Sequence, residues 1–498
     1  YQRSDHRLRW RLDAQFLNGK PLPVKTYQQF YIGGRWVMPS RPRTFELVNP
    51  ATEEVFAQVS LGSAEDVDLA VQAARRAFKS FSRCSKAERI ELLKSIVARF
   101  EARRTDVAAA ITEELGAHVA LTQLVSGSIE VFKQAITTLA DYEFEVRHGA
   151  HLVRREPLGV CGMITAWNWP AQLISTKLSS ALAAGCTAVV KPSEFTPVTA
   201  IVMAEIFHEA GVPAGVFNLV IGDGPGVGQA ICEHPDIDMV SFTGSTRAGV
   251  LVAQAAAPTI KRVAQELGGK SANIVLPDSD LKAAAEWTIG RAFFNSGQSC
   301  HAPTRMLVHA GQVDAVLGHL RAAVSALHVG DPKDPATTTG PLVNRAQFER
   351  VQQYIATGQR EGAQLICGGP GRPEGLSRGF FVRPTVFAGV TPEMTIAREE
   401  IFGPVLAVMA YENEEQAIEM ANASVYGLGA YVFSGDAKRG AAVARELRAG
   451  RVFVNGAASN HAAPMGGYKR SGNGREMGVF GLEEYLEVKA MFGVVEAC

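Results

Sequence analysis

The chain has 498 residues, 47% of them hydrophobic and 20% charged, and Lys plus Arg equal Asp plus Glu at 50 each. This balance argues against a nucleic-acid partner, and the lack of any apolar run of about 18 residues argues against a transmembrane helix. The length exceeds what one hydrophobic core serves, so the sequence predicts two or three domains.

The cysteines are scattered singly, at positions 84, 161, 186, 232, 300, 367 and 498. Their odd number and the absence of a CxxC pair indicate neither a disulfide framework nor a zinc site. Both features fit a reducing cytoplasm, where a thiolate survives as a nucleophile. We therefore expect a cytoplasmic protein without a catalytic metal. Residues 1–26 are polar and basic, lack the apolar core of a secretory signal and are expected to form an N-terminal extension.

Strand-like and helix-like segments alternate along the middle of the chain. Strands are predicted at residues 159–165, 188–190, 217–221 and 239–242, and helices at residues 174–184, 196–210, 227–234 and 246–257. This order predicts a parallel sheet covered by helices. A second α/β stretch covers about residues 271–464 and opens with a strand at 273–276 and a helix at 281–294.

Two further segments are typical of exposed strands. Residues 144–148 alternate in polarity. Residues 487–495 form a strand-like run whose apolar positions a monomer would leave at an exposed edge. The sequence therefore predicts a homodimer or homotetramer.

Cys300 is the candidate nucleophile. It ends the run FFNSGQSC at residues 293–300, and Glu266 lies upstream in QELGGK at residues 265–270. A thiol and a carboxylate base are the groups needed to form a thioester and hydrolyse it. The alternatives are ordinary, because free Cys is usually a small buried hydrophobe and Glu266 could be a solvated carboxylate at a strand end.

Six motifs follow one another in a fixed order: TAWNWP at 165–170, KPSE at 191–194, FTGST at 242–246, QELGGK at 265–270, FFNSGQSC at 293–300 and EEIFGP at 399–404. This set resembles the NAD(P)-dependent aldehyde dehydrogenase superfamily over about residues 30–489. The resemblance implies an α/β fold with a Rossmann-like cofactor domain, an α/β catalytic domain and a small β oligomerisation element. The implied limits are 27–139 and 158–267 for the NAD-binding domain, 268–464 for the catalytic domain, and 140–157 with 465–498 for the oligomerisation element and tail.

The resemblance also assigns the reaction, which is oxidation of an aldehyde to a carboxylic acid through a cysteine thioester hydrolysed by water. It makes Cys300 the nucleophile and Glu266 the base, and it gives Asn168 and the backbone N–H of Cys300 to the oxyanion. Taken alone, Asn168 could be only a turn residue. Glu476 is expected to support this site.

The cofactor contacts follow from the same resemblance. Lys191 and Glu194 are expected at the adenosine ribose, where the carboxylate would repel a 2′-phosphate and so favour NAD over NADP. The pyrophosphate is expected at the helix start formed by Gly244 and Ser245, although Ser245 could be only an N-cap. The remaining expected cofactor contacts are Thr165, Trp167, Gly268, Glu399 and Phe402. The glycine-rich run at 222–228 is either a phosphate loop or a tight turn.

The substrate pocket is expected to be small and polar on one side and apolar on the other. Thr176 stands where the family often has a bulky aromatic residue, and Met465 stands where it more often has Phe. The expected pocket residues are Trp169, Leu173, Thr176, Phe294, Ser299, His301, Asn460 and Met465. Such a pocket suits an aldehyde with a polar far end, such as a semialdehyde, unless His301 points away and the entrance is simply wide. The run at 301–305 also resembles a branch acting on bulky, oxygenated or heteroaromatic aldehydes.

Other activities use the same groups. A coenzyme A-acylating dehydrogenase would pass the acyl group to coenzyme A, but Glu266 favours hydrolysis. A thiol esterase would need no nucleotide site, and an inactive binding protein would need neither Cys300 nor Glu266. Identification of the product, free acid or acyl-coenzyme A, separates the acylating dehydrogenase from the predicted activity.

Overall fold

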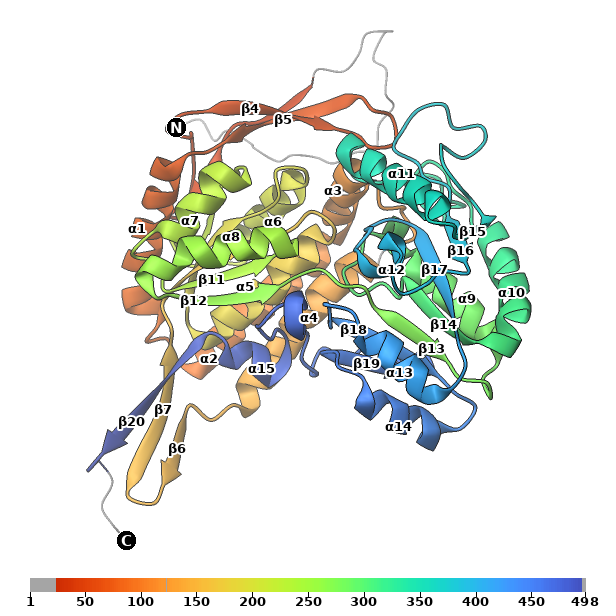
Figure 1. The fold of residues 1–498 in the computed structure, drawn as a ribbon. Helices are drawn as coiled ribbons and strands as arrows, with labels where there is room; N and C mark the ends of the chain where they lie inside the picture. Colours follow the sequence, from red (N-terminus) through yellow and green to blue (C-terminus); the bar gives the residue numbers. More distant parts are fainter. Residues whose placement is uncertain (1–23, 122, 495–498) are drawn as a thin grey trace.

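Two mixed β-sheets organise the computed structural model, which describes residues 24–121 and 123–494. The first has the strand order β12-β11-β8-β9-β10-β2-β3, and the second has the order β15-β16-β17-β14-β13-β18-β19. Figure 1 shows the first sheet with its helices on the left and the second on the right. The expected α/β architecture is confirmed.

Parallel strands form the centre of the first sheet: β12 (Arg262–Glu266), β11 (Met239–Thr243), β8 (Val160–Ile164), β9 (Thr187–Lys191) and β10 (Phe217–Leu219). Antiparallel strands β2 (Phe30–Ile32) and β3 (Arg35–Val37) extend one edge. Every residue of β8 and β9 is buried, as expected where helices cover both faces of a parallel sheet. The surrounding helices are α1 (Ala64–Phe81), α2 (Lys86–Ala102), α3 (Arg104–Leu115), α4 (Gln123–Asp141), α5 (Pro170–Ala184), α6 (Pro197–Glu209) and α8 (Thr246–Ala256).

Two predicted helix boundaries are wrong. Helix α5 begins at Pro170 rather than at residue 174, because proline's fixed φ suits the first helical position. The predicted helix at 227–234 is instead a π-helical turn over Gly224–Gly228 followed by the short α7 (Gln229–Glu233). The Asp223 side chain starts this turn early by accepting a 2.7 Å hydrogen bond from the Gly226 N–H. The glycines at 222–228 therefore serve a tight turn after β10.

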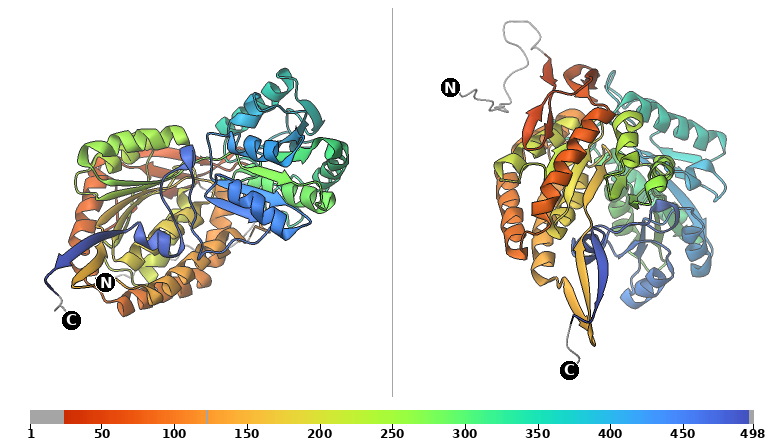
Figure 2. Two further views of the ribbon diagram at one scale, coloured as in Figure 1. Left: turned by 60° about the horizontal axis from the view of Figure 1, so that its bottom comes forward. Right: turned by 90° about the vertical axis from the view of Figure 1, so that its left-hand side faces the viewer.

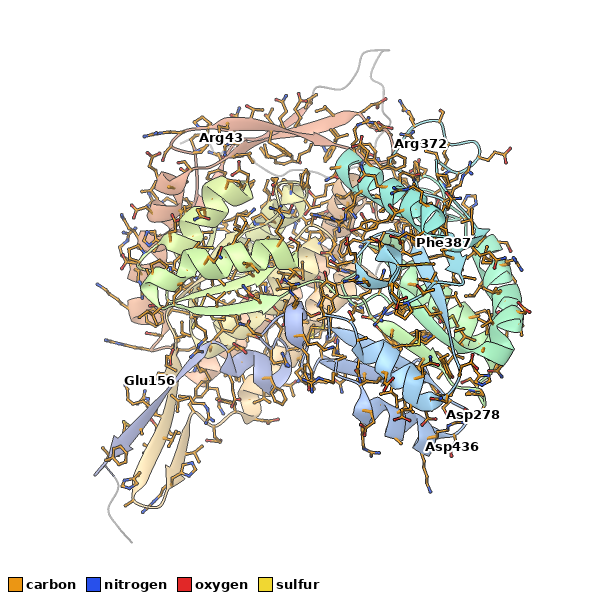
Figure 3. All side chains as sticks on the ribbon, in the orientation of Figure 1. Arg43, Glu156, Asp278, Arg372, Phe387 and Asp436 are labelled. Carbon is orange, nitrogen blue, oxygen red and sulfur yellow. The ribbon has the colours of Figure 1, made fainter. Side chains whose placement is uncertain are left out.

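The second sheet contains β15 (Gln364–Cys367), β16 (Thr385–Ala388), β17 (Val405–Tyr411), β14 (Arg305–His309), β13 (Ala272–Val275), β18 (Gly429–Phe433) and β19 (Arg451–Val454). Its helices are α9 (Leu281–Ala292), α10 (Val313–Ser325), α11 (Arg345–Arg360), α13 (Glu414–Asn422) and α14 (Ala437–Glu446). At the end of β18 the Asp436 N–H donates to the Asp278 carboxylate at 3.0 Å, and both residues are labelled in Figure 3. The buried apolar side chains around this sheet are separate from those of the first sheet.

A three-stranded antiparallel arm projects from the body. It consists of β20 (Leu486–Phe492), β7 (His151–Pro157) and β6 (Glu145–His148), and the right-hand view of Figure 2 shows it standing away from both sheets. Lys489 of β20 forms an ion pair with Glu156 of β7, which is labelled in Figure 3. Short helix α15 (Gly478–Glu483) lies at its base. Both predicted exposed strands are confirmed, although the second ends at residue 492.

A smaller sheet joins β1 (Lys25–Tyr27), β5 (Val55–Leu61) and β4 (Arg43–Val48). Residues 1–23 of the predicted extension lie outside the described residues, whereas Lys25 and Thr26 pair with β5. The domain limits remain predictions.

Candidate active site

Cys300 lies in an irregular segment between α9 and β14. Helix α9 ends at Ala292, short of the predicted residue 294, and Asn295, Ser296 and Gly297 then adopt φ values of 52°, 56° and 75°. Such left-handed backbone is costly outside glycine and persists only where the surroundings hold it. Here the Ser296 hydroxyl donates to the Gly340 carbonyl at 2.8 Å, and a Cβ on Gly297 would overlap the backbone of Gly403.

Asn168 connects the first sheet to this segment. It follows β8 and is only 3% exposed. Its Nδ2 donates to the Gln298 carbonyl at 3.0 Å, while its own carbonyl accepts from Asn295 Nδ2 at 2.9 Å. One Nδ2 hydrogen is thus used and the second is left for another acceptor. Asn168 is therefore part of a buried network at the nucleophile rather than a solvated turn.

Two aromatic pairs flank Asn168. Trp167 meets Phe402 edge to face with ring centroids 5.2 Å apart, and Trp169 stacks on Phe294 at 5.6 Å. Phe402 has φ 63°, a second strained position beside the site. The two tryptophans thus face different neighbours, one from the EEIFGP motif and one from the Cys300 segment.

His301 lies against the thiol. Its Nδ1 is 3.8 Å from Cys300 Sγ, and its Nε2 is 2.8 Å from an Arg291 Nη atom. A guanidinium only donates, so Nε2 must accept and the neutral ring carries its hydrogen on Nδ1, facing the sulfur. Burial, with Arg291 and Arg451 nearby, lowers the pKa of His301 well below its usual value. Burial, with the Glu400 and Glu266 carboxyls, raises the pKa of the Cys300 thiol to about 12.

Glu266 ends β12 and is 6% exposed, and neither carboxyl oxygen has a hydrogen-bond partner among the described residues. Burial and the nearby Glu476 raise its pKa well above the usual value. The alternative of a solvated strand-end carboxylate is therefore wrong. Buried Lys177 donates to Glu476 at 2.6 Å and to the Ser241 hydroxyl at 2.9 Å, leaving a charged pair close to Glu266.

Glycines allow the Glu266 segment to approach the nucleophile. A Cβ on Gly269 would overlap the carbonyl oxygen of Cys300, and one on Gly268 would overlap the Glu400 carboxylate. The Gly269 N–H donates to Glu400 Oε1 at 3.0 Å. Glu400, which the sequence did not single out, is buried enough to raise its pKa to about 7. Neighbouring Glu399 is exposed and accepts from the Tyr354 hydroxyl at 2.7 Å.

Several of the expected cofactor residues lie at the carboxyl ends of the first sheet's strands, whereas Glu399 and Phe402 precede β17 of the second sheet. Buried Lys191 donates to the Gly222 carbonyl at 2.6 Å and lies 3.7 Å from Glu194 Oε2, so this is not an ordinary surface ion pair. Exposed Ser245 caps α8, because its Oγ accepts from the Ala248 N–H at 3.2 Å, and Gly244 precedes it.

Two hydroxyls at this edge lack partners. Thr165 follows β8 and Thr243 ends β11, and both Oγ1 atoms are buried without a hydrogen bond among the described residues. Ligands of open α/β sheets bind at this edge, and a helix start favours phosphate. A partly exposed carboxylate, unpaired hydroxyls and the start of α8 together fit a dinucleotide.

The predicted substrate side is less regular. Thr176 and His461 line one cavity between α4, α5 and α15. The Ser299 hydroxyl is buried without a partner, and the Leu173 N–H donates to the Trp169 carbonyl. Around the other predicted residues lies a group that the sequence did not predict: Arg451 donates to Met465 Sδ at 3.7 Å and to the Asn460 carbonyl at 3.4 Å. The sequence feature that could have indicated this group is the charged Arg451 at the start of the otherwise apolar strand RVFV, residues 451–454.

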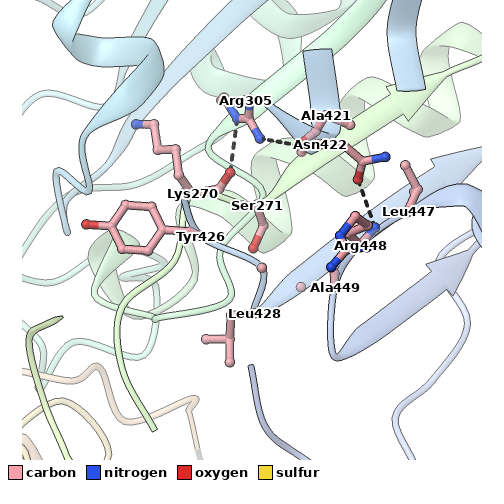
Figure 4. Close-up of a pocket in the computed structure, with 14 residues that line it drawn as sticks. Lys270, Ser271, Arg305, Ala421, Asn422, Tyr426, Leu428, Leu447, Arg448 and Ala449 are labelled. Atoms are coloured by element: carbon pink, nitrogen blue, oxygen red, sulfur yellow. Dashed lines mark hydrogen bonds between the residues drawn. The ribbon is translucent and has the colours of Figure 1, made fainter. Parts of the chain in front are cut away.

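Another pocket lies behind the nucleophile segment (Figure 4). Arg305 at its wall donates to the carbonyls of Lys270, Met420 and Ala421 at 2.9 to 3.0 Å. None of the predicted site residues lines it. The Arg305 guanidinium is therefore bonded to backbone oxygens and holds β14 in place, whereas the Nζ of Lys270, which also lines this pocket, is buried without a hydrogen bond among the described residues.

The described part of the chain contains no group of three His, Cys, Asp or Glu side chains that could hold a metal ion. Within residues 24–121 and 123–494, no helix is long and apolar enough to cross a membrane.

Comparison with known proteins identifies the family. The aldehyde dehydrogenase family model matches residues 36–491. A Pseudomonas sp. 3-succinoylsemialdehyde-pyridine dehydrogenase is 53% identical over 473 residues, covering 94% of this chain and 99% of that protein. A Pseudomonas syringae aldehyde dehydrogenase C mutant, solved with NAD⁺ and octanal, matches with a TM-score of 0.94 and 50% identity, covering 95% of this chain and 98% of that one. A Bacillus cereus aldehyde dehydrogenase solved with NAD⁺ matches with a TM-score of 0.90 and 41% identity, covering 93% and 96%. The protein belongs to the aldehyde dehydrogenase family, which confirms the expected oxidoreductase.

Proposed function

We propose that this protein uses NAD⁺ and water to oxidise an aldehyde to the carboxylic acid. The observation that carries the proposal is the hydrogen-bonded link between Asn168 and the Cys300 segment, with buried Glu266 at the end of β12 in the same sheet as β8. A nucleophile, an amide donor and a base thus come together from three separate parts of the sequence.

Addition of the thiol is the first step. The Cys300 thiol gives its proton to water, Sγ bonds to the carbonyl carbon as the carbonyl π bond opens, and the resulting oxyanion accepts from Asn168 Nδ2 and from the Cys300 N–H. The Nδ1 hydrogen of His301 faces the sulfur, so it stabilises the thiolate that a buried thiol otherwise forms reluctantly. NAD⁺, when bound, supplies the acceptor for the hydride, and the residues that would hold it are Lys191, Glu194, Thr165 and the start of α8.

Hydrolysis of the Cys300 thioester is the second step. Ionised Glu266 takes a proton from the attacking water, the new C–O bond forms, and the carbon–sulfur bond breaks to release the acid and the thiol. Burial and the nearby Glu476 raise the pKa of Glu266 above its usual value, which makes its carboxylate a stronger base toward the attacking water. The Lys177–Glu476 pair offers a polar neighbour through which the proton can leave.

We infer a preference for NAD⁺ over NADP⁺ from Glu194. Its carboxylate is partly exposed at the end of β9 and would accept from the two ribose hydroxyls. A 2′-phosphate in the same place would meet a like charge.

A polar or heteroaromatic aldehyde, such as a semialdehyde, is the substrate that we propose. His301 lies beside Cys300, and the guanidinium groups of Arg291 and Arg451 lie near it. One relative is named for a pyridine-bearing semialdehyde, whereas another was solved with octanal. A substrate panel must therefore separate a polar or heteroaromatic aldehyde from a long aliphatic one.

The test is an aldehyde panel followed by NADH formation, spanning short and long aliphatic, aromatic, heteroaromatic and carboxylate-bearing substrates. Free acid as the product supports the proposal. Acyl-coenzyme A formed in preference to acid would replace it with the acylating reaction, and ester hydrolysis without aldehyde oxidation would replace it with an esterase.

We further infer a homodimer or homotetramer built partly by the arm. Among the described residues the outer edge of β20 pairs with no strand, and Val488 and Phe492 are 64% and 70% exposed. Such an apolar edge invites pairing with a second copy. Light scattering should show an oligomer at micromolar concentration, and Val488→Asp with Phe492→Asp should weaken it. A wild-type monomer would contradict the inference. A cytoplasmic location stays a prediction.

A further inference from the structure

Two arginines near the nucleophile have no acidic partner among the described residues. Arg291 comes from α9, and its named contacts are His301 Nε2 at 2.8 Å and the face of Phe294, with Cζ 5.8 Å from the ring centroid. Arg451 opens β19, and its contacts are Met465 Sδ, the Asn460 carbonyl and the Phe453 ring at 5.4 Å. Both residues are only partly exposed.

Such a pair is expensive to maintain without a counter-charge. Two partly desolvated guanidinium groups repel each other, and Arg451 feels this repulsion from Arg291 in addition to its own burial. A sulfur atom, a carbonyl and an imidazole nitrogen are neutral acceptors, so the acid that acts on Arg451 is Glu266, through electrostatics and without a hydrogen bond among the described residues. Each guanidinium has five N–H groups, and the hydrogen bonds above use only some of them.

The position of the pair points to the substrate rather than the cofactor. Arg451 interacts electrostatically with Cys300 and also with His461, which lines the cavity between α4, α5 and α15. Arg291 contacts His301, which touches Cys300 Sγ, and Arg451 contacts the carbonyl of Asn460, next in sequence to His461, so both arginines lie among residues of the expected substrate pocket. The expected cofactor residues belong instead to the strand ends of the first sheet, on Lys191, Glu194 and the start of α8.

An aromatic wall completes this region. Tyr431 and Phe453 stack with ring centroids 5.2 Å apart, and the Tyr431 hydroxyl donates to the His301 carbonyl at 2.8 Å. Arg451 lies over Phe453, so its guanidinium plane is oriented by the ring. A fixed, planar guanidinium matches a carboxylate, which it can bind through two parallel hydrogen bonds.

We propose that Arg451, assisted by Arg291, binds a carboxylate at the far end of the aldehyde, so that the preferred substrates are semialdehydes bearing an acid group. This inference rests on the proposed aldehyde oxidation and adds the class of substrate. Arg451 is a specificity-determining residue here, whereas Arg291 has the further role of holding His301.

The experiment compares three aldehydes of equal chain length: an ω-carboxylate semialdehyde, its methyl ester and an n-alkanal, each in a series of four to eight carbons. Initial rates of NADH formation give kcat/KM for the wild type, Arg451→Met and Arg451→Lys. Arg448→Met is the matched control, because Arg448 is exposed and only three positions away. Inhibition by the corresponding dicarboxylate is measured on the wild type. This measurement tests carboxylate binding without a substitution that could disturb the fold.

In the wild type we expect the carboxylate substrate to exceed its methyl ester by about tenfold or more, and the dicarboxylate to compete with it. Arg451→Met should lower kcat/KM for the carboxylate substrate by about 10- to 100-fold, the usual loss for hydrogen bonds to a charged group. The loss should fall mainly on KM and be at least fivefold smaller with the n-alkanal. Arg451→Lys should keep more of the preference, and Arg448→Met should keep all of it.

The proposal would be overturned if the wild type had the same kcat/KM for the methyl ester as for the carboxylate substrate. The arginines would then bind a neutral oxygen or a heteroaromatic nitrogen. Equal losses with all three aldehydes in Arg451→Met would overturn it too, since Arg451 would then be structural. If no aldehyde yields NADH in the wild type, the proposed function itself fails. If the wild type oxidises the n-alkanal but shows no preference for the carboxylate substrate, the carboxylate site is refuted and the proposed aldehyde oxidation stands.

Discussion

The two sides of the active site are built in different ways. On the first sheet, Lys191, Glu194, Ser245 and Thr165 stand at strand ends or at a helix start, with regular backbone. On the second, Cys300 follows residues in left-handed conformations that side-chain hydrogen bonds hold in place. The cofactor side thus uses what regular α/β structure offers, whereas the nucleophile side needs irregular backbone.

The two sides also differ in how charge is compensated. Lys191 has a carboxylate partner and two carbonyl acceptors. Around the nucleophile, Glu266 from the first sheet is buried without a hydrogen bond, and Arg291 and Arg451 from the second make no hydrogen bond to an acid among the described residues. Uncompensated groups are destabilising unless a reactant meets them. The difference indicates that chemistry and substrate choice belong to the groups that converge on Cys300, and four experiments can break or sharpen that division.

The largest effect is expected from Cys300→Ala. Because a covalent nucleophile is lost, aldehyde oxidation should fall by more than about a thousandfold, and any esterase activity should go with it. An aldehyde-competitive alkylating agent should label one thiol in the wild type and none in the variant. Cys367→Ala is the control, because its half-buried thiol lies in β15. More than about a thousandth of wild-type activity in Cys300→Ala would assign the chemistry to another group.

Glu266→Gln should separate acylation from hydrolysis. If the carboxyl activates water, rapid mixing should still give a burst of NADH, while steady turnover falls by about a hundredfold or more for want of a general base. Gln keeps the shape of Glu266, so the fold is expected to be retained and any loss is assigned to the missing carboxylate. A burst that shrinks in step with the steady rate would instead make Glu266 the base that activates the Cys300 thiol.

The regular side was the more predictable one. The strand ends at Thr165 and Lys191 follow from alternating apolar segments and lie within one position of the predicted ends, whereas β12, which ends at Glu266, was not among the predicted strands. The start of α5 was missed because Pro170 initiates the helix directly after Asn168. The turn at 224–228 was missed because a side-chain cap on Gly226 lies outside simple periodicity.

The irregular side was predictable only in part. The motif gave Cys300, but periodicity extended α9 through residues 293 and 294, and nothing local required left-handed Asn295 and Ser296. Arg451 lies 151 positions from Cys300, so their proximity is a tertiary result of the order of the second sheet. The raised pKa values of Glu266 and Glu400 depend on burial, which the sequence does not specify residue by residue.

A substitution on the first sheet should change the preference between NAD⁺ and NADP⁺ and leave the preference among aldehydes unchanged. The wild type should favour NAD⁺ over NADP⁺ in kcat/KM by about tenfold or more, because Glu194 repels a 2′-phosphate. Glu194→Ser should narrow this ratio without changing the order of preference among aldehydes. The exposed Glu209→Ser at the end of α6 is a charge-matched control. Equal use of both cofactors by the wild type would contradict the role of Glu194.

The smallest effect is expected from the hydrogen bond between His301 and the thiol. Since burial and two carboxyls raise the pKa of Cys300 to about 12, iodoacetamide labelling of the free enzyme should rise with pH up to pH 10 without a plateau. A donor favours the thiolate, so removing it raises the thiol pKa and slows labelling at a given pH. His301→Leu should therefore slow labelling at pH 8 by about three- to tenfold, the value of an ordinary hydrogen bond, because the 3.8 Å contact to sulfur is long. His301→Asn, whose amide can place an N–H near the position of Nδ1, should restore most of the rate. Unchanged labelling in His301→Leu, or a plateau below pH 9 in the wild type, would show that the histidine does not act on the sulfur.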